Sequence, residues 1–320
     1  MSEINKLLGE VLIEVTRSNR IESLHGGHLI ILDQSGDINF SLGDYQSPIF
    51  PRSAIKAIQT SAMVRSGLKV GSEEIALISA SHAGSERHQE IVLNILRSVG
   101  LDERALKNTA DKPLGIKERR SWGDKKPTSL SANCSGKHAG MVATSLINGW
   151  DIESYKNPSH PLQQVIVKEL ENLSGEKITE ISLDGCGAPL FLISLFGLAQ
   201  SIHNLVNSHD LIHKEVVGAC LKHPELISGE GRIVTESMRL EPGLFMKDGA
   251  EGVMVAAIAG RATIVWKMSD GSNRGDKALI SAVLARVGVE LNFDPVEIFG
   301  DGQVVGSVRA SKLVLDEKRK

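Results

Sequence analysis

The sequence predicts an α/β protein of the α+β type, in which an antiparallel sheet built from both chain ends carries a largely helical middle portion. Two observations support this fold class. Strand-like apolar patterns occur near both ends of the chain, and the apolar spacing between these two β regions is helical. The 320 residues are expected to form a single unit, with a sheet subregion at about 1–50 and 250–320 and a helical subregion at about 51–249.

The individual elements follow from the same patterns. Alternating or short apolar runs between turn residues predict strands over 11–16, 28–33, 38–40, 252–259 and 261–267. Apolar residues three and four apart predict helices over 53–66, 73–80, 86–99, 135–148, 160–172, 188–200, 210–222 and 276–287. Catalytic groups are expected in the seam between the sheet and the helices, where clefts usually form.

Composition excludes several classes of protein. The apolar fraction of 41% and the charged fraction of 23% are typical of globular proteins, not of disordered or collagen-like chains. With 36 basic and 39 acidic residues the net charge is −3, and no basic face stands out, so nucleic acid is not an expected partner.

Membrane insertion and secretion are not predicted either. Residues 1–14 mix charges into their apolar residues, unlike a signal peptide, and no stretch approaches the ~20 apolar residues that cross a bilayer. We therefore expect a cytoplasmic protein that contacts no membrane.

The first candidate for chemistry is Ser53, which follows Pro51 at the start of a predicted helix, with Lys56 three residues later. Side chains at this spacing share one face of a helix, so the amine can reach the hydroxyl. A lysine can activate a serine if burial or a neighbouring cation lowers its pKa, and S-x-x-K is the nucleophile motif of serine β-lactamases. The alternative is a capping serine followed by a solvated lysine.

A second segment, 79–84, gathers Ser79, Ser81 and His82 near Gly84. Small residues at the end of a short helix can pack close to a substrate. The alternative is a serine-rich helix end with a glycine cap.

Two cysteines form the third candidate. Cys134 and Cys186 each lie beside glycines on an expected loop before a predicted helix. Two thiolates with a further nitrogen or oxygen ligand and water would make a zinc site. Two buried structural cysteines are an equally weighted alternative, although buried thiols prefer apolar neighbours such as those of Cys220, which we assign to the core.

The fourth candidate is Lys267, at the end of a late predicted strand. Serine β-lactamases present a lysine from a late strand in the motif K-T-G. Lys267 is not followed by the Thr-Gly of this motif. Taken alone, its position predicts a solvent-facing residue.

These segments together resemble the asparaginase II family, the rhizobial-type or class 3 L-asparaginases. The strings are R-S-A-I-K at 52–56, A-S-H-A-G at 80–84, N-C-S-G-K-H at 133–138 and D-G-C-G-A-P at 184–189. The resemblance implies a serine β-lactamase-like fold, shared with glutaminases, and hydrolysis of L-asparagine to L-aspartate and ammonia. It also implies a homodimer.

The resemblance also assigns roles to individual residues. It implies one Ser-Lys pair of Ser53 with Lys56, and a second of Ser81 with Lys267, with Ser79 as the alternative second serine. It implies a zinc ion (Zn²⁺) held by Cys134, Lys137 and Cys186, with water completing the shell. The residues expected to bind the substrate are Arg52, His82, His138 and Asp184.

A double Ser-Lys pair has a physical rationale. Two lysines that converge on one cleft repel each other, so one can stay neutral near pH 7 and act as a base. In this hypothesis Ser53 attacks the side-chain amide, and its proton passes through the lysines to the leaving ammonia.

Two other functions compete with this one. Another Ser-Lys amidohydrolase would use the same residues on a different substrate. A glutaminase would accept a side chain with one more methylene, and a β-lactam-reactive enzyme would open a cyclic amide. A non-catalytic, zinc-stabilised asparagine-binding protein would bind the ligand without releasing ammonia, and it would leave the second Ser-Lys pair without a role.

Overall fold

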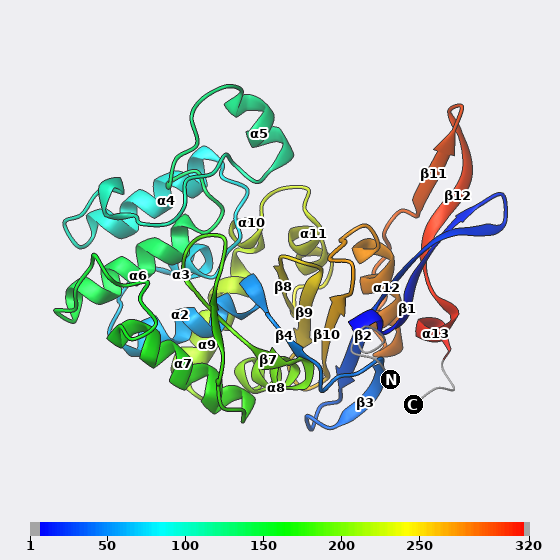
Figure 1. The fold of residues 1–320 in the computed structure, drawn as a ribbon, viewed down its shortest axis with the longest axis horizontal. Helices are drawn as coiled ribbons and strands as arrows, with labels where there is room; N and C mark the ends of the chain where they lie inside the picture. The colour runs from blue at the N-terminus through cyan, green and yellow to red at the C-terminus, as the bar shows by residue number, and fades with distance from the viewer. Residues whose placement is uncertain (1–6, 317–320) are drawn as a thin grey trace.

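The computed structural model describes residues 7–316 (Figure 1). Residues 1–6, which belong to the segment used above to argue against a signal peptide, lie outside this range. Within it, no helix combines the length and the apolar character that a membrane span requires.

The chain is organised around one antiparallel sheet. Its strands run in the order β11-β12-β1-β2-β10-β9-β8, and β3 also pairs with β2. Strands from both chain ends therefore build one sheet, as the sequence predicts. The strands are β1 (Glu10–Arg17), β2 (Arg20–Leu32), β3 (Ile38–Leu42), β8 (Leu244–Gly249), β9 (Val253–Ile258), β10 (Ala262–Met268), β11 (Val296–Gly300) and β12 (Gln303–Ala310). Because β8 begins at Leu244, the sheet starts earlier than the expected boundary near residue 250.

Strand β2 connects the two halves of the sheet. Its first half pairs with β1, and its second half lies between β10 and β3, so that Leu29 faces Trp266 on one side and Leu42 on the other. The four side chains of 29–32 are fully buried. Because both faces of the strand are covered here, its sequence is continuously apolar and does not alternate. Complete burial of one such side chain contributes roughly 1.5–3 kcal/mol.

Most helices lie in the middle of the chain. They are η1 (Arg52–Ile55), α2 (Lys56–Arg65), α3 (Ser72–Ile78), α4 (Glu86–Arg97), η2 (Glu103–Ala105), α5 (Ile116–Trp122), α6 (Ser135–Ile147), α7 (Pro161–Ser174), α8 (Leu195–Val206), α9 (Leu211–Lys222), α10 (Pro224–Ile227), α11 (Ile233–Leu240), α12 (Asp276–Arg286) and α13 (Lys312–Leu315). The expected helices are present, except over 188–200.

The helix expected over 188–200 is wrong in its first half. The chain forms β6 (Pro189–Phe191) and β7 (Ile193–Ser194) there, which pair with β5 (Ile181–Leu183) and β4 (Pro48–Ile49). Helix α8 begins only after Ser194, whose hydroxyl accepts a hydrogen bond from Gly197 N and caps the helix. The apolar run alone does not separate these short strands from the helix.

Side-chain caps also fix where other helices begin. At α4 the Ser85 hydroxyl accepts from His88 N, while the His88 ring accepts from Ser85 N, which is a reciprocal capping box. Asp210 caps α9 by accepting from Ile212 N. Such a cap contributes about 1 kcal/mol to helix stability.

The packing places η1 and the start of α2 between sheet and helices. Helix α2 packs against α6, α7 and α9, whereas η1 packs against β8 and β9. In Figure 1 these helices gather at one end of the molecule, and the β11–β12 hairpin extends at the other. The seam between β8 and η1 is therefore where side chains of both parts can meet.

Two helical glycines give opposite predictions for stability. A Cβ added to Gly136 on α6 would lie 2.4 Å from Leu77 O on α3, whereas one added to Gly218 on α9 would meet no atom within 4 Å. We expect Gly136→Ala to lower the free energy of unfolding by about 1–3 kcal/mol through overpacking. Gly218→Ala should raise it by about 0.5–1 kcal/mol through helix propensity. Urea denaturation measures both, and equal effects would contradict the close α3–α6 approach.

Candidate active site

Ser53 lies in the short turn η1, directly ahead of α2. The residue before it, Arg52, has φ = 52°, in the left-handed region that non-glycine residues rarely adopt. On the sheet side, a Cβ added to Gly249 at the end of β8 would lie 2.6 Å from Pro51 O. A close approach of β8 thus holds the turn that presents Ser53.

Ser53 lines a cavity of about 240 Å³. Segments from distant parts of the sequence contribute its walls, including the turn after β8 and both cysteine loops. The lining residues are Arg52, Ser53, Thr109, Ala110, Asp111, Ala132, Asn133, Cys134, Asp184, Gly185, Cys186 and Ala250. Arg52 and Asp184, two of the expected substrate-binding residues, are both among them.

Ser81 lies between two buried lysines. Its hydroxyl accepts a hydrogen bond from Lys56 Nζ at 3.1 Å and from Lys247 Nζ at 3.0 Å. Lys56 Nζ also donates to Ala80 O at 2.5 Å. The lysine side chains come from α2 and β8, so the helical part and the sheet meet at one hydroxyl.

The buried position of Lys56 changes its protonation. Burial, and after it the charges of Lys247 and Lys137, lower the pKa of Lys56 to about 7, although the cysteine thiolates oppose this. Burial also lowers the pKa of Lys247, but the adjacent Asp248 carboxylate opposes that change. Near neutral pH a substantial share of Lys56 is therefore an uncharged amine, the form that accepts a proton.

The pairing of Ser81 with Lys267 is wrong. Lys267 lies on β10, and its Nζ donates to Glu251 O at 2.7 Å and to Met268 O at 2.5 Å. These bonds attach Lys267 to the turn after β8, and no hydrogen bond joins it to Ser81 in the described part of the chain. Lys247 occupies the place expected for it.

The lysine contacts also separate the two candidate serines. The Ser79 hydroxyl donates to Thr60 Oγ1 at 2.8 Å and to Ile75 O at 3.1 Å, inside the helical core. Ser81, not Ser79, contacts the lysines. Within residues 7–316, no hydrogen bond joins Lys56 Nζ to Ser53, so Ser53 and Lys56 share the start of the helix without a direct bond.

Arg52 and Asp184 form an ion pair at the cavity. Arg52 Nε lies 2.9 Å and Nη2 2.8 Å from Asp184 Oδ1. Both side chains remain partly exposed, at 22% and 16%. One cation and one anion beside Ser53 suit a ligand that carries both an ammonium and a carboxylate group.

The other two expected substrate-binding residues do not line this cavity. His82 is fully buried, with Nε2 2.9 Å from Ser135 Oγ and its ring stacked on His88. His138 is also fully buried, and its Nδ1 lies 2.7 Å from the Tyr155 hydroxyl. A direct substrate contact is therefore not supported for either histidine.

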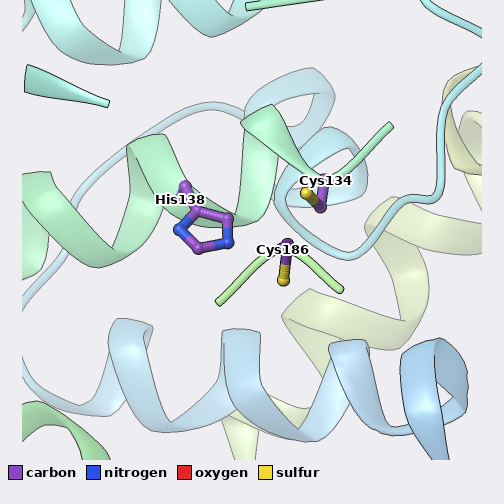
Figure 2. A group of neighbouring side chains, drawn as sticks. All are labelled: Cys134, His138 and Cys186. Atoms are coloured by element: carbon purple, nitrogen blue, oxygen red, sulfur yellow. The ribbon is translucent and has the colours of Figure 1, made fainter. Parts of the chain in front are cut away.

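Three potential metal ligands converge beside the cavity. Figure 2 shows Cys134 directly before α6, His138 in the first turn of α6, and Cys186 on a separate loop. Their ligand atoms all lie within 4.8 Å of one another. A buried cluster of two sulfurs and one imidazole nitrogen matches the donors that zinc prefers.

Two nitrogen atoms lie beside such a cluster. Lys137 Nζ lies 3.4 Å from Cys186 Sγ, and the net effect of its surroundings is to raise its pKa, because the nearby thiolates outweigh burial. Burial lowers the pKa of His138 to about 4, so its ring is neutral at pH 7. The buried His138 ring also interacts with the Cys186 sulfur, so a neutral imidazole nitrogen lies beside the two sulfurs.

The two thiols have unequal acidities. A hydrogen bond from Cys134, together with the Lys137 charge, lowers the pKa of Cys186, whereas the same hydrogen bond and burial raise the pKa of Cys134. Burial raises the pKa of Cys220 to about 12, which fits its assignment to the core. A thiolate at Cys186 is the form that binds metal.

Lys247, which contacts Ser81, is not among the residues expected from the sequence. It begins the string Lys247-Asp248-Gly249 at the end of β8. This K-x-G at a strand end matches the spacing of K-T-G, whereas Lys267 lacks a glycine two residues later. The K-x-G spacing is therefore a usable signal, although the expected sheet boundary near residue 250 places Lys247 in the helical part.

Comparison with known proteins gives one family. A family model described as L-asparaginase II matches residues 13–310. A search of curated proteins finds no match.

Solved structures with a similar arrangement come from several enzyme classes. The native form of Mglu has a TM-score of 0.46 and 12% identity, covering 83% of this chain and 66% of its own, so this chain spans just under two thirds of Mglu. A Bacillus glutaminase has a TM-score of 0.42 and 12% identity, covering 77% and 84%. Penicillin binding protein 6B from Escherichia coli has a TM-score of 0.41 and 13% identity, covering 92% and 88%. Likenesses this distant assign no substrate to this chain.

The site geometry predicts how Lys56 titrates. Replacing Lys247 by methionine removes a like charge, so we expect the pKa of Lys56 to rise above its value of about 7. The pH dependence of the Lys56 13Cε signal, assigned with Lys56→Met, measures this pKa by NMR. Lys267→Met is the matched control and should leave the Lys56 pKa unchanged. Equal shifts in both variants would contradict the assignment of Lys247.

Proposed function

The chain belongs to the L-asparaginase II family of amidohydrolases, and we propose that it hydrolyses the side-chain amide of L-asparagine to L-aspartate and ammonia. The observation that carries the proposal is the Ser81 hydroxyl held between Lys56 and Lys247, in the seam beside the turn that presents Ser53. A buried amine whose pKa is about 7 is a base suited to activating a serine at neutral pH.

In the first step, Ser53 Oγ attacks the carbon of the side-chain amide. Lys56, in its neutral form, accepts the hydroxyl proton, which requires its amine to come within hydrogen-bond reach of Ser53 Oγ when the substrate is bound. The carbon–nitrogen bond then breaks, and the leaving nitrogen takes a proton that is relayed through Ser81 and Lys247, so ammonia departs. In the second step, water attacks the resulting ester, aspartate is released and the Ser53 hydroxyl is restored.

Backbone amides offer a site for the negative charge that develops on the amide oxygen. Ser53 and Ala250 line the cavity from opposite sides of the seam. In the described part of the chain, neither N–H donates a backbone hydrogen bond. Two such donors aimed at one oxygen contribute roughly 2.7–4 kcal/mol each to transition-state stabilisation.

The ends of the amino acid would be held by the Arg52–Asp184 ion pair. The Arg52 guanidinium suits the α-carboxylate, and the Asp184 carboxylate suits the α-ammonium group. This leaves the side-chain amide to point toward Ser53. The small cavity, about 240 Å³, fits an amino acid of this size.

We further propose that Cys134 and Cys186 hold a zinc ion, with a nitrogen from Lys137 or His138. When bound, the metal would join the two cysteine loops and orient the polar end of the substrate. Lys137 must lose its proton to serve as a ligand, whereas His138 is already neutral.

The activity is tested by measuring ammonia release from L-asparagine, D-asparagine and L-glutamine. We expect release from L-asparagine and a loss of about 10³-fold or more in Ser53→Ala, because the nucleophile is removed. Lys56→Met should cause a comparable loss. L-Glutamine adds one methylene, which a tight pocket discriminates by about 1–3 kcal/mol, so faster release from L-glutamine would identify a glutaminase.

The binding-protein alternative predicts a different result. Binding of L-asparagine would then raise the melting temperature without any ammonia release. That outcome, or full activity in Ser53→Ala, would contradict the proposed mechanism.

The metal proposal is tested by the zinc content of the purified protein. Cys134→Ala and Cys186→Ala should each lower the bound zinc and weaken substrate binding, because each removes a thiolate ligand. Cys220→Ala is the matched control, since Cys220 lies in the core away from the cluster and should leave the zinc content unchanged. Lys137→Met and His138→Gln identify the nitrogen ligand. A normal zinc content in both cysteine variants would contradict the site.

A further inference from the structure

An ion pair that the mechanism above does not use lies next to the Ser81 cluster. Arg232, at the start of α11, donates from Nη2 to Asp248 Oδ2 at 2.9 Å and from Nη1 to Ser81 O at 3.2 Å. A single guanidinium therefore binds both the main chain of Ser81 and a carboxylate on β8.

The second oxygen of that carboxylate contacts the lysine. Asp248 Oδ1 accepts from Lys247 Nζ at 2.5 Å, and the same amine donates to Asp248 O at 2.6 Å. These bonds fix the ammonium end of a side chain that otherwise rotates freely about its four-carbon stem. From Arg232 the contacts thus reach Ser81 along two routes, one through its carbonyl and one through Asp248 and Lys247.

We propose that Arg232 and Asp248 are positioning residues, which hold the Ser81 main chain and the Lys247 amine so that the Ser81 hydroxyl stays within reach of both lysines. The inference rests on the proposed function, because it assigns a role in that proton relay. Neither residue lines the cavity beside Ser53, so neither acts by binding the substrate there.

The placement distinguishes this pair from an ordinary surface ion pair. The side chains of Arg232 and Asp248 are 26% and 23% exposed, and that of Lys247 only 2%. The Ser81 N–H is already bound to Ile227 O at 3.0 Å. The bond from Arg232 to Ser81 O therefore fixes the carbonyl of this residue, so both main-chain polar groups of Ser81 are held.

The geometry also requires an arginine. The planar guanidinium presents separate N–H groups to two acceptors, Ser81 O and Asp248 Oδ2, whereas the compact ammonium of a lysine acts as a single point charge. A displacement of about 1 Å in a catalytic group costs on the order of 10²-fold in rate. Loss of this support should therefore slow the chemical step and leave substrate affinity nearly unchanged.

The test compares kcat and KM for ammonia release from L-asparagine in Arg232→Ala, Arg232→Lys and Asp248→Asn. We expect kcat to fall by about 10- to 100-fold while KM stays within about twofold. Added guanidinium ion should restore part of kcat in Arg232→Ala, because it can occupy the vacated site. Arg232→Lys and Asp248→Asn conserve size, and they keep the test decisive if Arg232→Ala fails to fold.

Arg239→Ala is the matched control. Arg239 lies on the same helix α11 and forms an ion pair with Glu230 at 2.6 Å, but both side chains are well exposed, at 41% and 68%. This variant should keep the wild-type kcat, and guanidinium should not increase it. Melting temperatures of all variants report on folding independently of rate.

The outcomes separate the inference from the function on which it rests. An active wild type with kcat within about twofold in Arg232→Lys and Asp248→Asn would overturn the inference alone. A loss that appears only in KM, or an equal loss in Arg239→Ala, would overturn it as well. A folded wild type that releases no ammonia from any amide contradicts the proposed function, and the inference falls with it.

Discussion

The site depends on the burial of two lysine amines against one hydroxyl. Lys56 and Lys247 both lie in the core, and both donate to Ser81 Oγ. Two ammonium groups in such a place are costly, because burial removes their hydration and their charges repel. The structure reduces this cost at Lys247 with the Asp248 carboxylate and at Lys56 by favouring the neutral amine. The neutral form of Lys56 lowers the cost of burying two amines, and this neutral amine is also the form that acts as a base.

The antiparallel sheet makes this meeting of residues possible. Along β8, alternate residues point to the same face, so Lys247 and Gly249 both lie on the side that η1 approaches. Glycine at 249 lets the Pro51 carbonyl come close, and this sets the distance between the strand and the turn of Ser53. The helical part then supplies Lys56 from α2 and Ser81 from the loop after α3. No single element contains the whole site, so its geometry depends on how the sheet packs against the helices.

Short sequence motifs indicated most of the candidate site residues. They did not indicate which residues from distant segments contact each other. Ser53, Ser81 and the two cysteines stand in short motifs, and the structure brings these segments to one seam. The choice between Lys247 and Lys267 depends on which strand faces η1, and β9 separates their strands in the sheet. The error over 188–200 has the same origin, because β6 and β7 form by pairing with segments elsewhere in the chain. The expected homodimer and cytoplasmic location stay predictions.

The cysteine cluster and the lysine cluster act on each other through charge. Negative charge on the cysteine pair raises the pKa of Lys56, whereas the charge of Lys137 lowers it. Removing one cysteine therefore changes a metal ligand and the electrostatic surroundings of the base together. Activity alone cannot assign the cause of a loss in such a variant. Zinc content reports on the first effect and the Lys56 titration on the second, and only their comparison shows which of the two a cysteine serves.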